Sequence, residues 1–225
     1  KDSFLSWDML GVNLWTREHS TPNKEPAVIH QIRFPKGLPG FITCISYIPR
    51  LRLFVAAALD MSFKIYNRNL ELIESIAHEE RALLGMEYDD IRDILVVSGA
   101  RGVSLWRLSR AVNAGLEYIT ERTYVYEDLV DVWISSIRLE ISLGHIYAIS
   151  GSSIYVLSIS DRQILHAMRD IHEFPVTCIC WYGRSQFFLT GCTEGLIKCW
   201  TSFHYQKGRK TEEEEGLEEN NDKKS

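Results

Sequence analysis

Short apolar runs separated by turn residues recur along the whole chain, and they are clearest between residues 172 and 200. Three runs follow one another there, at residues 176–181, 187–191 and 196–200. Turns around Gly183 and Gly195 separate them. Runs of this length, rich in β-branched and aromatic residues and bounded by glycine and polar residues, are typical of β-strands. The pattern therefore predicts three short strands joined by two turns.

The same unit recurs in other parts of the chain. Residues 41–66 align with residues 175–200 without a gap, and weaker copies lie at residues 83–106 and 132–157. A truncated copy opens the chain, where Gly-Val-Asn-Leu-Trp at 11–15 matches Gly-Val-Ser-Leu-Trp at 102–106. The third strands are thus predicted to end at Trp15, Tyr66, Trp106, Leu157 and Trp200. A fourth strand fits into each gap, at residues 27–33, 70–76, 117–126 and 163–168.

These third-strand ends are 51, 40, 51 and 43 residues apart, which resembles the period of WD40 repeats, about 40–45 residues with four strands each. The resemblance covers roughly residues 1–203. His78 and His172 match the family's histidine before the first strand, and Asp60, with Glu194 as a conservative substitute, matches its aspartate. The closing tryptophan is matched at Trp15, Trp106 and Trp200, with Tyr66 in its place once. The Trp-Asp dipeptide itself is absent at all of these strand ends.

The resemblance implies an all-β fold, a WD40-like β-propeller that forms an incomplete ring. Three full four-stranded blades and two partial ones are expected within residues 1–205, followed by a disordered, charged tail or linker at 206–225. Because an open ring leaves strand edges exposed, we expect the native ring to include residues before Lys1. The blade-forming residues would be His78, Trp106, Asp60 and Tyr66, and His172, Glu194 and Trp200 would form a structural lock within the last blade.

Four of the five cysteines, Cys178, Cys180, Cys192 and Cys199, lie in the last repeat, and the fifth is Cys44. Their spacing differs from the paired C-x₂₋₄-C pattern of structural zinc sites. Small buried thiols in a packed sheet are the favoured interpretation, and a disulfide or a metal site remains as an alternative. Free buried thiols suit a reducing compartment, so a cytoplasmic location is expected.

Charge and motifs narrow the function classes. The formal net charge of −5 disfavours a nucleic-acid role, because binding to phosphates depends on clustered Lys and Arg. No apolar run approaches the roughly 18 residues of a membrane span. The G-x-S-x-G, P-loop and G-x-G-x-x-G motifs are absent from the sequence. We therefore predict a non-enzymatic protein without a cofactor, whose partners are other proteins.

The propeller resemblance implies binding through loops that a rigid scaffold holds. By match to the family pattern, the loop residues on one flat face would be Asp60, Arg81, Arg101, Ser153, Phe174 and Glu194. Tyr118, Tyr124 and Tyr126 form a second candidate surface if they are exposed, although they would instead pack on the blade if the outer strand is simply longer.

The predicted function is a protein-interaction scaffold that is a fragment of a larger protein. Its propeller and charged tail resemble the layout of large ciliary or flagellar WD-repeat proteins. The alternatives are the substrate receptor of a ubiquitin ligase and a histone or nucleic-acid reader.

Overall fold

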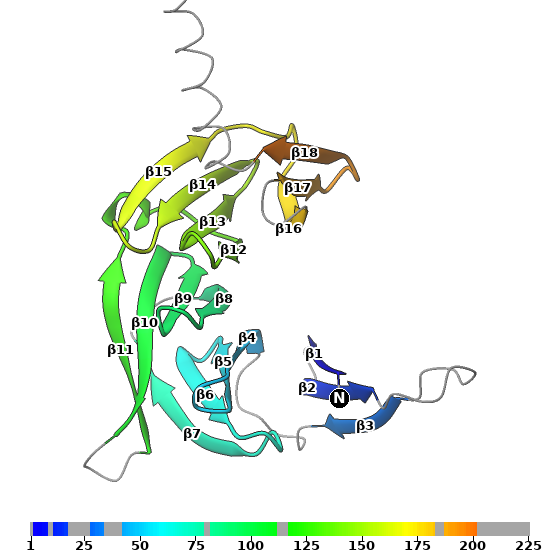
Figure 1. The fold of residues 1–225 in the computed structure, drawn as a ribbon, viewed down its shortest axis with the longest axis vertical. Helices are drawn as coiled ribbons and strands as arrows, with labels where there is room; N and C mark the ends of the chain where they lie inside the picture. The colour runs from blue at the N-terminus through cyan, green and yellow to red at the C-terminus, as the bar shows by residue number, and fades with distance from the viewer. Residues whose placement is uncertain are drawn as a thin grey trace, which may run out of the picture. The chain divides into compact units, whose positions relative to one another are not determined.

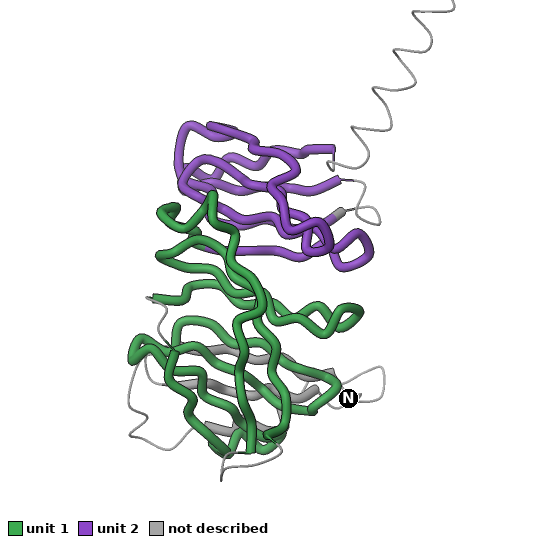
Figure 2. Tube along the Cα trace, turned by 90° about the vertical axis from the view of Figure 1, so that its left-hand side faces the viewer, with its two compact units in different colours: residues 1–135 green, residues 136–225 purple. Residues whose placement is uncertain are grey.

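The computed structural model describes residues 2–8, 11–17, 28–33, 42–78, 82–111, 117–182 and 187–201, the first three of these ranges as backbone only. The described residues are almost all strands and turns, with one short 3₁₀-helix and no α-helix. The chain forms two compact units, residues Lys1–Ser135 and Ser136–Ser225 (Figure 2). The predicted tail at 206–225 lies outside the described residues.

Unit 1 contains three antiparallel sheets, each of which follows the order of the sequence (Figure 1). The first is β1 (Asp2–Asp8), β2 (Gly11–Arg17) and β3 (Val28–Arg33). The second is β4 (Ile42–Ile48), β5 (Leu53–Ala58), β6 (Ser62–Tyr66) and β7 (Leu72–Ala77). The third is β8 (Leu83–Asp89), β9 (Ile94–Gly99), β10 (Gly102–Arg110) and β11 (Tyr118–Val125), followed by the 3₁₀-helix η1 (Glu127–Leu129).

Unit 2 contains two antiparallel sheets of the same kind. The first is β12 (Ser136–Glu140), β13 (His145–Ser150), β14 (Ser153–Ser158) and β15 (Gln163–Met168). The second has three described strands, β16 (Val176–Tyr182), β17 (Phe187–Cys192) and β18 (Ile197–Thr201).

The sheets confirm the all-β class, and three full blades and two partial ones were predicted. The described residues form three four-stranded and two three-stranded sheets. The fourth strands lie at the predicted positions, β15 with both bounds as predicted. All six residues of β5 are buried, as its unbroken apolar run predicts. The structure differs from the prediction in β10, which was expected to end at Trp106. The strand continues to Arg110, because β11 pairs with it along that extension.

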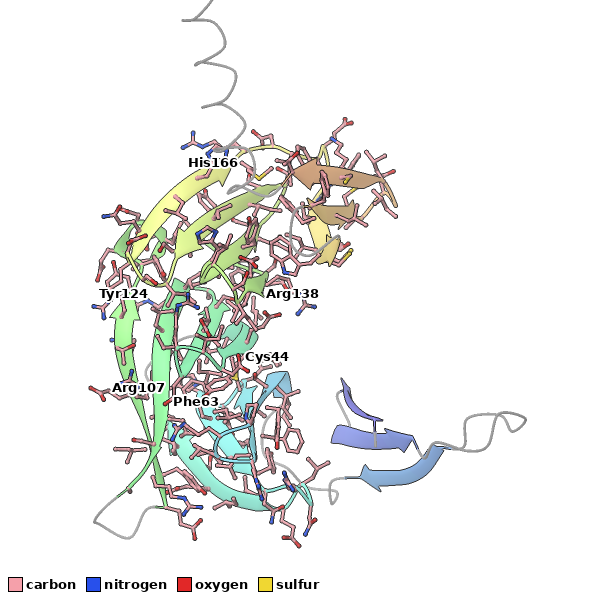
Figure 3. The ribbon with its side chains drawn as sticks, in the orientation of Figure 1. Cys44, Phe63, Arg107, Tyr124, Arg138 and His166 are labelled. Atoms are coloured by element: carbon pink, nitrogen blue, oxygen red, sulfur yellow. The ribbon has the colours of Figure 1, made fainter. Side chains whose placement is uncertain are left out.

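The core of unit 1 lies between its two four-stranded sheets. Val55, Phe63 and Ile65 are fully buried and contribute one side of it, and Leu95, Val97 and Trp106 are among the residues that contribute the other. Cys44 and Phe63, labelled in Figure 3, belong to this core. Burial raises the pKa of the Cys44 thiol to about 12, so the thiol stays protonated at neutral pH.

The core of unit 2 is built in the same way, by one sheet packing on the next. Tyr147 and Val156 of the four-stranded sheet are buried in one apolar cluster with Ile179 and Phe188 of the three-stranded sheet. Tyr147 meets Phe188 edge-on, with ring centroids 5.2 Å apart. Both units therefore stack twisted sheets through alternating side chains.

Candidate interaction surface

A chain of hydrogen bonds holds the closing tryptophan of the β16–β18 sheet. The indole N–H of Trp200 donates to Thr190 Oγ1 at 2.8 Å. The same oxygen lies 2.7 Å from Nε2 of His172, a histidine that is 2% exposed. Burial, reinforced by the nearby Lys198 ammonium, lowers the pKa of His172, so the ring is neutral at pH 7. The predicted lock therefore exists, with Thr190 at its centre.

Two details of this lock differ from the prediction. Glu194 is exposed and makes no hydrogen bond or ion pair among the described residues, so its assignment to the lock is wrong. Thr190 was missed, although a hydroxyl inside the apolar run Phe-Phe-Leu-Thr-Gly is a usable signal, because a buried hydroxyl needs a partner.

The β8–β11 sheet holds Trp106 by different means. The position equivalent to Thr190, two residues after the cross-strand partner of the tryptophan, is Val97. The indole N–H of Trp106 instead donates to Ser104 Oγ of its own strand at 2.8 Å. The ring meets Phe63 edge-on at 5.2 Å and lies 6.4 Å from the ring of His78.

His78 is buried and packs on Phe63 with ring centroids 4.7 Å apart. Its backbone N–H donates to the Met61 carbonyl at 2.9 Å. It therefore ties the connection after β7 to the β5–β6 turn of its own sheet.

Asp60 occupies the turn between β5 and β6 and has a structural role there. Its carboxylate accepts bonds from Lys64 Nζ at 2.7 Å and from Ser62 Oγ at 2.6 Å. Burial works to raise the pKa of Asp60, but the bonds from Lys64 and Ser62 outweigh it and the pKa is lowered. The side chain of Lys64 is only 3% exposed, so Asp60 balances a nearly buried ammonium.

The turns that follow the second strands of unit 1 lie at one end of its sheets. Backbone bonds join them to the connections between sheets, from Ala100 to Ala82 at 3.0 Å and from Ile134 to Gly99 at 3.0 Å. Leu59 and Met61, each 51% exposed, and Trp133, 56% exposed, are at this end, together with the exposed Arg101. We call Leu59, Met61, Arg101 and Trp133 the turn surface.

The segment that carries Trp133 is anchored on the β9–β10 turn. Tyr126 donates its backbone N–H to the Val103 carbonyl at 3.1 Å. Gly102 has a φ of +79°, and the Leu129 carbonyl oxygen lies so close that it would be 2.2 Å from a Cβ at position 102. A glycine is required here by both the conformation and the contact. Trp133 is therefore exposed on a segment whose backbone is fixed, which limits the entropy that binding would cost.

A cavity of about 180 Å³ opens beside Arg101. Arg101, Arg122 and Glu127 line it together with Val125 and Val130. Arg122 also lies over the Trp106 ring, 5.9 Å from its centroid. Two arginines and one glutamate thus line the cavity together with two valines.

Comparison with known proteins accounts for this arrangement of sheets. Residues 167–201, which contain the lock, match the WD40 family model described as "WD domain, G-beta repeat". The fold is a WD40-like β-propeller. Among solved structures, the computationally designed Ika4 protein is similar in fold, with a TM-score of 0.55 and 18% identity, over 74% of this chain and 94% of that chain. A search of curated proteins finds no match.

The predicted loop residues differ in exposure and in hydrogen bonding. Arg101 and Phe174 are exposed, Phe174 at 39%, whereas Arg81 lies outside the described residues. In unit 2, Ser153 Oγ accepts the backbone N–H of Asp170 at 3.0 Å, which holds a turn of its blade. The sequence reasoning missed Trp133, because nothing in its local pattern distinguishes an exposed tryptophan from a core one.

The tyrosine surface is largely contradicted. Tyr118 and Tyr126 are only 4% and 2% exposed, so of the two alternatives left open by the sequence they pack on the blade and do not form an exposed surface. Tyr124 is partly exposed and meets Tyr126 edge-on at 5.1 Å (Figure 3).

The cysteines differ from their predicted burial. Cys44 and Cys192 are buried, but Cys178, Cys180 and Cys199 are exposed, and all five thiols are free. Across the described ranges, no group of three His, Cys, Asp or Glu side chains could hold a metal ion. In the same ranges, no helix is long and apolar enough to cross a membrane.

Proposed function

We propose that this chain is a non-enzymatic protein-interaction scaffold that binds a partner protein through the turn surface of unit 1. The WD40-like fold supports a scaffold role in general. The observation that carries this proposal is Trp133, which is 56% exposed on an anchored segment. Tryptophan and arginine are enriched among the residues that dominate binding energy, and here Arg101 accompanies Trp133.

The chemistry of the surface defines the partner segment it fits. Leu59, Met61 and Trp133 offer apolar contact, and the cavity beside Arg101 and Arg122 offers guanidinium groups to an acidic side chain. Charge-assisted bonds between arginine and carboxylate add orientation to apolar burial. The partner segment is therefore proposed to carry an apolar residue next to an aspartate or glutamate.

The cellular setting belongs to the same proposal. The proposed setting is a cytoplasmic scaffold within a larger ciliary or flagellar protein. The free thiols support the cytoplasmic location, and the charged composition of residues 206–225 supports the layout.

Quantitative affinity capture tests the proposal with matched variants. Trp133→Ala and Arg101→Glu change the turn surface, and Ile91→Ala changes an equally accessible residue, 68% exposed, in the β8–β9 turn at the other end of the same sheet. Loss of a binding hot spot of about 2 kcal/mol lowers affinity about 30-fold. Partners should be lost with the first two variants and kept with the control. Equal recovery with all three variants would show that binding, if any, uses another surface.

A further inference from the structure

The chain's own sequence contains a segment with the chemistry proposed above for the partner. Residues 212–219 read Glu-Glu-Glu-Glu-Gly-Leu-Glu-Glu, so Leu217 directly precedes one glutamate and has others close on both sides. Leu217 is also the only large apolar residue between positions 206 and 225. We call residues 212–219 the acidic segment.

The turn surface of unit 1 carries the complementary charge. Arg101 is exposed, and its guanidinium makes no hydrogen bond or ion pair with any residue that the structure describes. In the cavity beside it, Arg101 and Arg122 stand against the single carboxylate of Glu127 and leave one positive charge. One glutamate of the acidic segment balances that charge, and an arginine also gives a carboxylate a defined orientation.

The apolar part of the turn surface suits the one apolar residue of the segment. Leu59, Met61 and Trp133 are each about half exposed. The backbone that carries Trp133 is held in place, because the Ile134 N–H donates to the Gly99 carbonyl at 3.0 Å. A leucine side chain laid on these three residues removes apolar surface from water on both sides of the contact.

We propose that the acidic segment binds the turn surface of its own chain, with Leu217 against Trp133 and one glutamate at Arg101. It thereby competes with the partner protein. This inference rests on the proposed function, because it uses the same surface. Residues 202–211 join the end of β18 to the segment, and ten residues extend to about 35 Å.

The tether sets the strength of the competition. A short contact of one leucine and one carboxylate binds weakly as a free peptide, with a Kd on the order of 0.1–1 mM. A segment tied to the chain that it binds has an effective concentration of about 1 mM. The segment therefore occupies the surface for about half to nine-tenths of the time, and the apparent affinity for a partner falls about 2- to 10-fold.

Fluorine NMR of the whole chain labelled with fluorotryptophan tests the contact, with the Trp133 resonance assigned from Trp133→Phe. Leu217→Ser should shift this resonance, and a free peptide of residues 211–220 should shift it back. Asn221→Ser, just outside the acidic segment, should leave it unchanged. Raising the salt from about 0.05 to 0.5 M should act as Leu217→Ser does, because salt screens exposed charge pairs.

Concentration distinguishes the chain's own segment from that of a second copy. The effect of Leu217→Ser should be the same at about 10 and 200 µM, because a tethered ligand has a fixed effective concentration. An effect that appears only at the higher concentration would overturn the proposal, since the segment would then bind another chain. A Trp133 resonance that Leu217→Ser leaves in place would overturn it as well.

Affinity capture of the partner measures the competition and separates the two proposals. Leu217→Ser should raise the affinity for the partner about 2- to 10-fold, and Trp133→Ala should lower it. Unchanged affinity with Leu217→Ser, together with loss of the partner in Trp133→Ala, would overturn the competition and leave the proposed function standing. Equal capture by Trp133→Ala and the unchanged chain would instead overturn the proposed function and with it the competition.

Discussion

Trp106 and Trp200 close equivalent strands in two blades, yet the structure holds them differently. Trp106 is 6% exposed, because the neighbouring sheet of unit 1 covers it through Phe63. Its N–H needs only Ser104 of its own strand. Trp200 is partly exposed and stacks on Phe188 at 6.5 Å. Its N–H donates to Thr190 Oγ1, which is also hydrogen-bonded to His172 Nε2.

The difference shows that the closing tryptophan can be fixed by apolar packing or by polar bonds. The WD40 family model matches the blade with the polar lock, whereas the β8–β11 blade reaches the same strand arrangement with Val97 in place of the threonine. Packing tolerates this exchange because a large buried ring contributes mostly through burial.

The largest expected effect is that of Trp106→Ala. It removes a buried indole from the contact between two sheets and should lower the free energy of unfolding by about 3–5 kcal/mol. Trp200→Ala removes a partly exposed ring and should cost about half as much. Urea unfolding of both variants measures the comparison. A larger loss for Trp200→Ala would contradict the packing explanation.

Thr190→Val tests the polar lock with little change of volume. It leaves the Trp200 N–H and His172 Nε2 without their shared partner, and should cost about 2–3 kcal/mol. The matched variant Val97→Thr places a hydroxyl at the equivalent site, which is 1% exposed. The N–H of Trp106 does not use a hydroxyl there, because it donates to Ser104. It should also destabilise, by about 1–2 kcal/mol. A neutral Thr190→Val would show that the lock does not stabilise the blade.

The two acidic residues at the equivalent turns should behave differently. Asp60→Asn removes the charge that balances Lys64 and should cost about 2 kcal/mol. Glu194→Gln changes an exposed side chain that makes no hydrogen bond or ion pair among the described residues, and the free energy of unfolding should change by less than about 0.5 kcal/mol. Thermal unfolding of the two variants measures this difference. Equal losses would mean that Glu194 has a structural role after all.

The smallest effect concerns pH. Because the pKa of His172 is lowered in the folded state, the unfolded chain binds a proton more readily below its ordinary pKa of about 6.5. Stability should therefore be unaffected above that pH and decline as the pH falls below about 6.5. His172→Gln should flatten this decline in urea unfolding at a series of pH values, and an unchanged slope would place its origin elsewhere.

Much of the fold follows from local pattern. The five third strands and the buried run of β5 could be predicted because a strand's period and its bounding turns are encoded in adjacent residues. The burial of Cys44 and the exposure of Cys178 could not be predicted, although the two residues occupy equivalent positions of the repeat. Burial depends on whether another sheet covers the face on which the residue lies. Trp133 depends in the same way on the path of the segment after β11.

Only part of the candidate site could be predicted from the sequence, for the same reason. Arg101 follows from its place in a turn of the repeat, whereas the sequence leaves open whether Tyr118 and Tyr126 are exposed or pack on the blade. Their burial depends on the pairing of β10 with β11, which extends beyond the length of the repeat.

Site-specific photo-crosslinking tests the central claim most directly. A photoreactive amino acid replaces Trp133 on the turn surface in one variant and Ile91, at the other end of the same sheet, in a second. The account predicts that a partner protein crosslinks at position 133 and not at position 91. Crosslinking at position 91 alone would contradict the assignment of the turn surface as the binding site.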